Sequence, residues 1–419
     1  MSSGQMTPEE AARYILGREL FGMRFGLDRM RRVMTALGHP ERRFQSIHVV
    51  GTNGKSSTVR MIAAILERHG LRTGSYLSPH LISYTERIRV GDEDLEPRAF
   101  AAAVARAAHA SELVDRSLAE GERVTQFELL TAAAYYELAR RQVDVGVIEA
   151  GLGGRYDATN VIPSRVQVLT SVGLEHTRWL GPTISDIAGE KLDVVQERGT
   201  LVLAHGLQPD ALAVAERVAG ARHAEIVHAL ADAGVELAVR GAFQRRNFAT
   251  ARSAAESFLG ELDEAAVAAA AAEVSVPGRL QVIEEQPLTL LDGAHNPEAM
   301  AALVESIPPL VAGRTGGVVV LLSILDDKDA AGMLAAILPV ADAFVFTASR
   351  HPRALPPPTL ESLARQLGGP PAEIVPEPHA ALAHARRLAG PGGVVLATGS
   401  LYLVADVVRP ARDVRASVL

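Results

Sequence analysis

The chain has 419 residues, of which 48% are hydrophobic and 22% are charged. This balance is typical of globular proteins and excludes a disordered chain, and the length predicts two domains. The formal net charge of −7 provides no basic footprint for nucleic acid, so we expect no nucleic-acid partner. The chain has no cysteine, which excludes disulfides, thiolate metal sites and a cysteine nucleophile.

The first residues and the apolar stretches carry no targeting or membrane signal. Residues 1–10 are polar and lack the basic-then-apolar order of a signal peptide. No uninterrupted apolar run approaches the ~18 residues that span a bilayer. We therefore expect a cytoplasmic protein without membrane contact.

Two helices are predicted ahead of the first strand. Residues 7–20 have Thr7 as a candidate N-cap and Pro8 at the first helical position. Residues 28–37 form the second helix, with Asp28 as a candidate cap and Gly38 at its end. This stretch is too short for a separate domain.

A Gly-rich turn between a strand and a helix is the central motif of the chain. The β-branched run at 47–50 leads into G-T-N-G-K-S-S-T at 51–58, and 59–69 has helical spacing. Such a turn aims backbone N–H groups and a helix N-terminus at one point, which favours a phosphate. Lys55 adds a positive charge, and the hydroxyl of Ser56 or Ser57 is a candidate magnesium ligand. The alternative is a turn whose glycines only permit tight packing, since the generic phosphate-loop pattern requires Gly at Val49.

Polar residues also follow three other predicted strands. Ser78 lies in a Ser-Pro-His turn, Glu149 directly follows the apolar run 143–148, and His176 follows the strand 166–172. Open α/β sheets bind ligands at the carboxyl ends of their strands, so these residues are candidate magnesium ligands. The alternatives are an ordinary turn for Ser78, a solvated strand end for Glu149 and a structural role for His176.

The rest of the chain alternates strands and helices, which predicts a doubly wound parallel sheet in each of two domains. We place a phosphate-loop ATPase domain at 1–275 and a smaller Rossmann-like α/β domain at 276–419. The predicted helices and strands after the loop are 96–119, 126–141, 143–148, 166–172, 184–195, 200–204, 210–218, 225–228, 248–259, 263–274, 288–291, 317–322, 330–338, 343–347, 358–367, 379–388 and 394–398.

Seven sequence motifs, taken together and in this order, resemble the folylpolyglutamate synthetase family. The family includes the bifunctional bacterial dihydrofolate synthetase/folylpolyglutamate synthetases and belongs to the Mur ligase superfamily. The motifs are G-T-N-G-K-S-S-T at 51–58, L-S-P-H at 77–80 with E-R-I at 86–88, I-E-A-G-L-G-G-R-Y-D-A-T-N at 148–160, E-H-T-R-W-L-G at 175–181, P-G-R-L at 277–280, D-G-A-H-N-P at 292–297 and T-G-S-L-Y at 398–402.

The resemblance implies an ATP-dependent, ADP-forming ligase with two magnesium sites. In this family a folate-side carboxylate attacks the γ-phosphate of ATP, and the amino group of L-glutamate then displaces phosphate from the acyl phosphate. Magnesium and Lys55 would neutralise the charge that develops between the two anions. The implied small molecules are ATP, L-glutamate and a folate or dihydropteroate.

The resemblance also implies roles for individual residues. Lys55, His295 and Lys191 match catalytic positions, and Lys191 matches a lysine that is carbamylated in the family. The magnesium positions are matched by Ser56, Ser78, Glu149 and His176. The nucleotide-binding positions are matched by Thr52, Asn53, Gly54, Lys55, Ser56, Ser57, Asn247, Arg279 and Asp292, and less closely by Gln244.

Three departures from the family pattern concern the metal site and the reach of the substrate. Glu175 stands where relatives have Asp, and Leu192-Asp193 replaces a small Ala-Gly pair after Lys191. The stretch from about Ala224 to Gln244 is shorter than in relatives. Whether the substrate is dihydropteroate, a reduced folate or both stays open, as does the length of the glutamate chain.

Two alternative functions also stay open. A phosphate-loop kinase or NTPase would share the loop but not the D-G-A-H-N-P motif. A Mur-type ligase acting on another acid would share the chemistry, but a peptidoglycan ligase needs an additional N-terminal domain, and only residues 1–50 precede Gly51. A chain with two α/β domains encloses its own cleft, so we expect a monomer.

Overall fold

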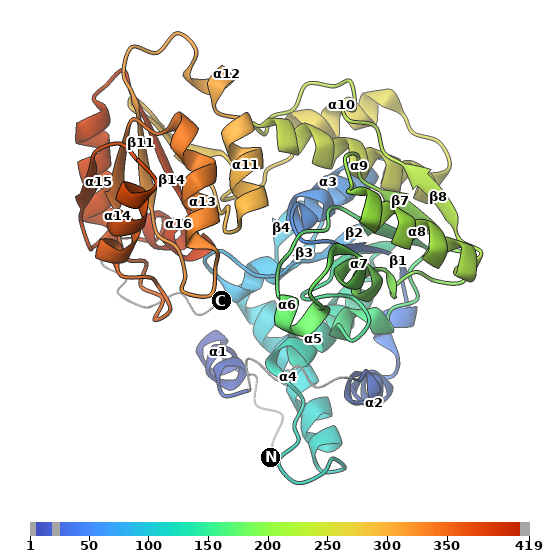
Figure 1. The fold of residues 1–419 in the computed structure, drawn as a ribbon. Helices are drawn as coiled ribbons and strands as arrows, with labels where there is room; N and C mark the ends of the chain where they lie inside the picture. The colour runs from blue at the N-terminus through green and yellow to red at the C-terminus, as the bar shows by residue number, and fades with distance from the viewer. Residues whose placement is uncertain (1–5, 19–25, 411–419) are drawn as a thin grey trace. The chain divides into compact units, whose positions relative to one another are not determined.

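A computed structural model of the chain describes residues 6–18 and 26–410. These residues form two compact units, each built around its own sheet (Figure 1). Unit 1 comprises the described residues up to Leu237 together with Arg245–Val274, and unit 2 comprises Ala238–Gln244 together with the described residues from Ser275 onward. Two sheets rich in parallel strands confirm the predicted α/β class.

Unit 1 has an eight-stranded sheet whose centre carries the Gly-rich turn. The strand order is β4-β3-β2-β5-β1-β6-β7-β8, and only the pairs of β3 with β2 and with β4 are antiparallel. Strand β1 pairs with β5 and β6 in parallel, with Val49 opposite Glu149. The carboxyl ends of these three strands therefore meet at one edge of the sheet. The strands are β1 (Gln45–Val50), β2 (Thr73–Tyr76), β3 (Ile88–Val90), β4 (Glu93–Asp94), β5 (Val145–Glu149), β6 (Val166–Leu169), β7 (Thr200–Leu203) and β8 (Glu225–His228).

Helices cover both faces of this sheet (Figure 1). A core of buried side chains joins α1, α2, α4 and α5 to one face, a second core joins α7 and α8 to β6 and β7, and α3 contacts α10. The helices are α1 (Pro8–Leu16), α2 (Asp28–Leu37), α3 (Lys55–Arg68), α4 (Pro97–Asp115), α5 (Gln126–Arg140), α6 (Thr177–Leu180), α7 (Ile184–Leu192), α8 (Pro209–Arg222), α9 (Ala242–Leu259) and α10 (Glu264–Glu273).

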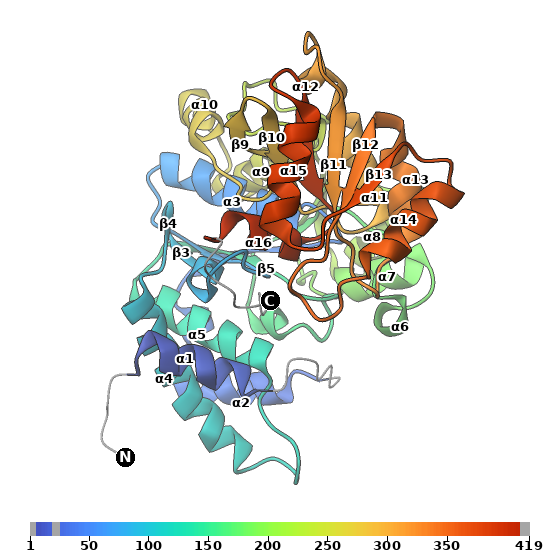
Figure 2. The same cartoon turned by 90° about the vertical axis from the view of Figure 1, so that its left-hand side faces the viewer.

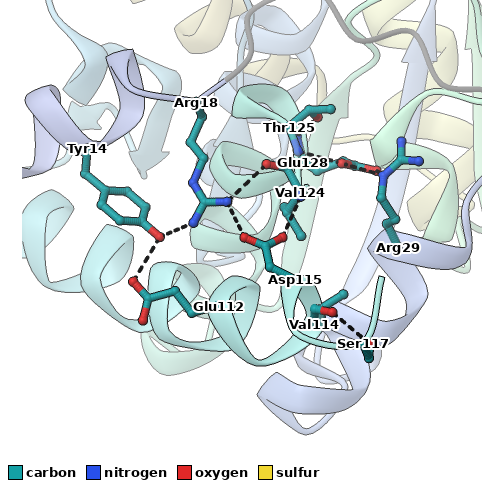
Figure 3. Close-up of polar contacts among 10 residues, drawn as sticks. All are labelled: Tyr14, Arg18, Arg29, Glu112, Val114, Asp115, Ser117, Val124, Thr125 and Glu128. Atoms are coloured by element: carbon teal, nitrogen blue, oxygen red, sulfur yellow. Dashed lines mark hydrogen bonds and ion pairs between the residues drawn. The ribbon is translucent and has the colours of Figure 1, made fainter. Parts of the chain in front are cut away.

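Ion pairs attach the first two helices to the layer formed by α4 and α5 (Figure 3). Arg18 donates to Asp115 at 2.6 Å and also contacts the Tyr14 hydroxyl. Arg29 of α2 lies 3.2 Å from Glu128 of α5. These arginine side chains are largely buried, so the pairs are less screened by solvent than surface pairs.

Unit 2 has a six-stranded sheet in the order β13-β12-β11-β14-β10-β9, with only β9 antiparallel to its neighbour. Figure 2 shows α15 on the near face of this sheet, and α16 contacts α15 and β14. Side chains of α11, α13 and α14 pack in a core with β10, β11, β12 and β14. The elements are β9 (Gln281–Glu285), β10 (Leu288–Leu291), β11 (Val318–Leu322), β12 (Ala343–Phe346), β13 (Ala372–Ile374), β14 (Val394–Thr398), α11 (Pro297–Glu305), α12 (Pro308–Val311), α13 (Ala330–Ile337), α14 (Pro357–Gln366), α15 (Pro378–Ala389) and α16 (Leu401–Val408).

Several predicted element bounds were wrong. Helix α9 begins at Ala242 and not at 248, so Gln244 and Asn247 are helical and do not precede the helix. Leu27 is the N-cap of α2, and Asp28 is its first residue. The short strands β3, β4, β9 and β13 were missed because two to five residues carry too little periodicity. Residues 19 and 20 of the first predicted helix lie outside the described residues.

No helix in residues 6–18 and 26–410 combines the length and the apolar character needed to cross a bilayer.

Candidate active site

The Gly-rich turn between β1 and α3 depends on two glycines. Gly54 is the N-cap of α3 at φ 86°, a left-handed conformation that Gly adopts without a steric cost. A Cβ at Gly54 would lie 2.6 Å from Asn247 Oδ1, and a Cβ at Gly51 would lie 1.9 Å from Thr170 Oγ1. Glycine at these positions therefore allows the turn to lie against α9 and against the residues that follow β6.

Residues that follow β6 hold the backbone of the turn. Ser171 accepts the Thr52 N–H on its carbonyl oxygen at 2.9 Å and the Asn53 N–H on its hydroxyl at 2.8 Å. The Thr170 hydroxyl donates to the Asn53 carbonyl at 2.7 Å. Thr170 and Ser171 are not among the residues predicted from the sequence, although their place directly after a buried strand was the available signal.

Two lysine amino groups converge on one carbonyl oxygen of the turn. Lys55 Nζ lies 3.1 Å from Gly51 O and 3.1 Å from Thr52 O. Lys191 Nζ donates to the same Gly51 O at 2.9 Å, and its side chain is 4% exposed. Burial, reinforced by the positive charge of Lys55, lowers the pKa of Lys191 to about 7, although Glu175 and Asp157 partly oppose this shift. A poorly solvated pair of amino groups attracts an anion such as a nucleotide phosphate.

Glu149 connects the turn with the loop that follows β2. Its side chain is 1% exposed, and it accepts the Ser56 hydroxyl at 2.9 Å and the Ser78 N–H at 3.1 Å. The structure therefore brings together three of the four predicted magnesium positions. Ser57 is also buried.

His176, the fourth predicted magnesium position, lies at the start of α6 in the left-handed region with φ 53°. Its Nε2 atom lies 3.7 Å from Glu175 Oε1, and the imidazole is 41% exposed. Within the two described ranges, no three His, Asp or Glu side chains form a group that could hold a metal ion. The predicted metal set is not such a group, because two of its members are serines.

The side chains of the two residues after Lys191 are held by other groups. Leu192 is fully buried in the core between α7 and the sheet. The Asp193 carboxylate faces Arg155 at 3.6 Å and Arg222 at 3.9 Å. The added negative charge is therefore balanced by arginines.

In unit 2 the D-G-A-H-N-P motif follows β10. Asp292 is 3% exposed and accepts the N–H groups of Leu280 at 2.9 Å and of Ala294 at 2.8 Å. Burial raises the pKa of Asp292, and the positive charge of Arg279 opposes this effect. Gly293 leaves room for Arg279, because a Cβ there would lie 2.3 Å from Arg279 Nη1.

His295 is oriented by a backbone carbonyl of the same motif. Its Nδ1 lies 2.9 Å from Gly293 O, so Nδ1 carries the proton and donates it to this carbonyl. Nε2 of the neutral ring is then the atom that can accept a proton.

Comparison with known proteins places both units in one class. Residues 278–401 match the model of the Mur ligase glutamate ligase domain. With the similarity to folylpolyglutamate synthases that covers both units, this match defines an ATP-dependent, ADP-forming ligase of the Mur type.

The chain belongs to the folylpolyglutamate synthase/dihydrofolate synthase family. It is 33% identical to the dihydrofolate synthase/folylpolyglutamate synthase of Bacillus subtilis, over 95% of this chain and 98% of that one. Folylpolyglutamate synthase of Mycobacterium tuberculosis complexed with ADP aligns with a TM-score of 0.87 and 31% identity, covering 95% of this chain and 96% of that one. Escherichia coli FolC in complex with DHPP and ADP aligns with a TM-score of 0.84 and 29% identity, covering 96% and 97%. These similarities confirm the family and the enzyme class predicted from the sequence.

Proposed function

We propose that this protein adds L-glutamate to the carboxylate of dihydropteroate and of reduced folates. Lys55 and Lys191 carry the proposal, because their amino groups meet at Gly51 O beside the phosphate-binding turn. Relatives that this chain resembles over most of its length are named for both substrate steps.

The chemistry requires two transfers in sequence. A substrate carboxylate oxygen attacks the γ-phosphorus of ATP, and the bond from that phosphorus to the bridging oxygen of ADP breaks. The glutamate nitrogen then attacks the acyl carbon, phosphate leaves with the bond electrons, and the nitrogen gives up a proton to form the amide. We assign the phosphates to Lys55 and to the backbone N–H of Gly54, while Thr52 and Asn53 shape the turn, since their N–H groups are donated to Ser171.

The oxygen atoms around Glu149 fit a magnesium ion. The Ser56 hydroxyl and the Glu149 carboxylate are hard donors 2.9 Å apart, and a buried carboxylate gains from a nearby cation. We assign magnesium to Ser56, Glu149, Ser78 and His176. When bound, the ion would neutralise charge on the phosphate oxygens.

We further propose that Lys191 is carbamylated. A pKa of about 7 leaves a large share of the amine neutral at neutral pH, and the neutral amine is the form that reacts with carbon dioxide. The carbamate would replace a positive charge with a negative one and support a second magnesium. Mass spectrometry after ¹³C-bicarbonate labelling and chemical trapping tests this, and an unlabelled Lys191 under labelling conditions would contradict it.

In unit 2 we assign ATP contacts to Arg279 and Asp292 and a position near the acyl phosphate to His295. Asn247 of α9 is assigned to the nucleotide, since its Oδ1 lies beside Gly54. The cytoplasmic location and the monomeric state expected from the sequence stay predictions.

The test is phosphate release that depends on glutamate, with magnesium and ATP, using dihydropteroate and tetrahydrofolate in parallel. A product one glutamate heavier than dihydropteroate supports the dihydrofolate synthase step, and a series of heavier products from tetrahydrofolate supports polyglutamylation. Turnover with neither pterin would contradict the proposed substrates.

A further inference from the structure

A buried chain of polar side chains connects β1 with the loop that follows β5. His48 lies on β1 and Thr159 lies in a short 3-10 helix, Ala158–Val161. Both side chains are 0% exposed, and His48 Nε2 lies 2.8 Å from Thr159 Oγ1. The sequence gives no local signal for this contact, because the two residues are far apart in the chain.

The hydrogen bonds of Thr159 determine the tautomer of His48. Thr159 Oγ1 donates its proton to Asp157 Oδ1, so its lone pair is available to accept the proton on His48 Nε2. Nδ1 of His48 then carries no proton, and it is buried without a hydrogen-bond partner in the described part of the chain. Burial lowers the pKa of His48 to about 4, so the ring is neutral at physiological pH.

The same series of buried polar side chains also anchors the loop that follows β5. Asp157, 6% exposed, also accepts the N–H groups of Leu152 at 2.8 Å and of Thr159 at 3.0 Å. The Tyr135 hydroxyl of α5 donates to the Thr159 carbonyl at 2.9 Å. The loop 151–160 is therefore anchored to β1 through His48 and to α5 through Tyr135.

This loop lies between two parts of the candidate active site. It begins directly after the strand that ends at Glu149, which lies beside Val49 of β1. On its other side, a Cβ at Gly154 would lie 2.4 Å from the Lys191 carbonyl. A displacement of the loop would therefore move the backbone beside both Glu149 and Lys191.

We propose that His48 is a positioning residue for the ligase reaction. Its Nε2–H group donates to Thr159 and so holds the loop 151–160 in the place that Glu149 and Lys191 require. The role rests on the proposed magnesium-dependent function of this site. His48 contacts neither nucleotide nor metal in this proposal and acts only through the loop.

Paired variants test the proposal. Thr159→Val removes the hydroxyl at nearly constant volume, and Thr159→Ser keeps it. His48→Leu removes the donor, and His48→Gln places an amide N–H near the position of Nε2. Each is compared with the wild type by its melting temperature, by kcat and KM, and by the magnesium concentration that half-saturates binding of AMPPCP.

We expect Thr159→Val and His48→Leu to raise this magnesium concentration about tenfold or more and to lower kcat, since residues that orient ligands typically contribute 10–100-fold. Binding of ADP without magnesium should stay unchanged, and Thr159→Ser and His48→Gln should restore the wild-type values. A folded Thr159→Val protein with wild-type magnesium dependence, or one that only melts at a lower temperature, would overturn the proposal.

The tautomer provides a readout that needs no turnover. ¹⁵N NMR of the imidazoles should show His48 protonated on Nε2, assigned by its absence in His48→Gln, and unchanged from pH 5 to 8. A ring protonated on Nδ1 would overturn the inference. If the wild type ligates neither pterin, the proposed substrates fail, while AMPPCP binding and the NMR signal still decide the role of His48.

Discussion

Each unit presents polar side chains at the carboxyl edge of a mostly parallel sheet. The surroundings of these side chains differ between the two units. In unit 1, the amino groups of Lys55 and Lys191 share the Gly51 carbonyl, and Lys191 is nearly inaccessible to solvent. In unit 2, the carboxylate of Asp292 accepts two backbone N–H groups and lies near the charge of Arg279. Unit 1 therefore brings like charges together, whereas unit 2 satisfies its buried charge locally.

The difference indicates which edge depends on a ligand. Two amino groups at one carbonyl repel each other, and burial makes this more costly because solvent screens them poorly. An incoming polyphosphate would relieve this cost at the amine form of Lys191, and carbamylation of Lys191 would also remove it. Asp292 already has its partners, so it defines the shape of the turn without a ligand. A change at Lys55 or Lys191 should thus mainly affect catalysis, whereas a change at Asp292 should also lower stability, because its carboxylate holds two backbone N–H groups.

Removal of Lys55 should have the largest effect. Lys55→Ala eliminates the positive charge that we assign to the transferring phosphate, and we expect kcat to fall by about 10²–10³. Arg31→Ala is the control, since Arg31 is 64% exposed on α2 and its removal should leave kcat unchanged. Normal turnover of a folded Lys55→Ala protein would refute the phosphate-loop assignment.

Glu149→Gln should raise the magnesium requirement at least about tenfold. The glutamine oxygen can accept the Ser78 N–H while its NH₂ group donates to the Ser56 hydroxyl, so both contacts can persist, but the charge that attracts the cation is lost. Glu137 is a matched control, because it is also 1% exposed but pairs with Arg140 and Arg141 of the same segment. Glu137→Gln should lower stability alone; equal magnesium dependence in both variants would argue against Glu149 as a ligand.

Asp292→Asn should destabilise the fold of unit 2 by about 1–3 kcal/mol. One of the two N–H groups that the carboxylate accepts would then face an amide NH₂. Asp329→Asn is the comparison, since Asp329 is exposed and accepts only the Gly332 N–H at the start of α13. Chemical denaturation measures the free energy of unfolding of both variants. If Asp329→Asn lowers it as much as Asp292→Asn does, burial of the carboxylate is not the cause of the loss.

The lowered pKa of Lys191 predicts that the free energy of unfolding rises with pH. Its folded pKa of about 7 lies below the ordinary lysine value of 10.5, so between these values the unfolded chain binds more protons. The free energy of unfolding should therefore increase with pH in this window, relative to Lys191→Met, by at most about 1.4 kcal/mol per pH unit. Denaturation at several pH values in bicarbonate-free buffer measures this increase. If the free energies of unfolding of the wild type and of Lys191→Met change with pH in parallel, the lowered pKa is contradicted.

The Gly-rich turn between β1 and α3 and the place of Glu149 at a strand end were predictable because each is a local pattern. A β-branched run, glycines and Lys55 are consecutive, and Glu149 directly follows an apolar strand. Alternating strands and helices likewise predicted two parallel-rich sheets, since this pattern repeats within short windows. The short strands β3, β4, β9 and β13 were missed, because two to five residues carry too little periodicity.

The family and the α/β class could be predicted from the sequence alone. The three-dimensional structure was needed to show that Lys191 shares a carbonyl with Lys55, that Thr170 and Ser171 hold the turn, and that His48 contacts Thr159. The physical reason is that strand and turn propensities act between near neighbours in the chain. Burial and hydrogen bonds between distant segments, which set the pKa of Lys191 and the tautomer of His48, arise only when the sheet brings those segments together.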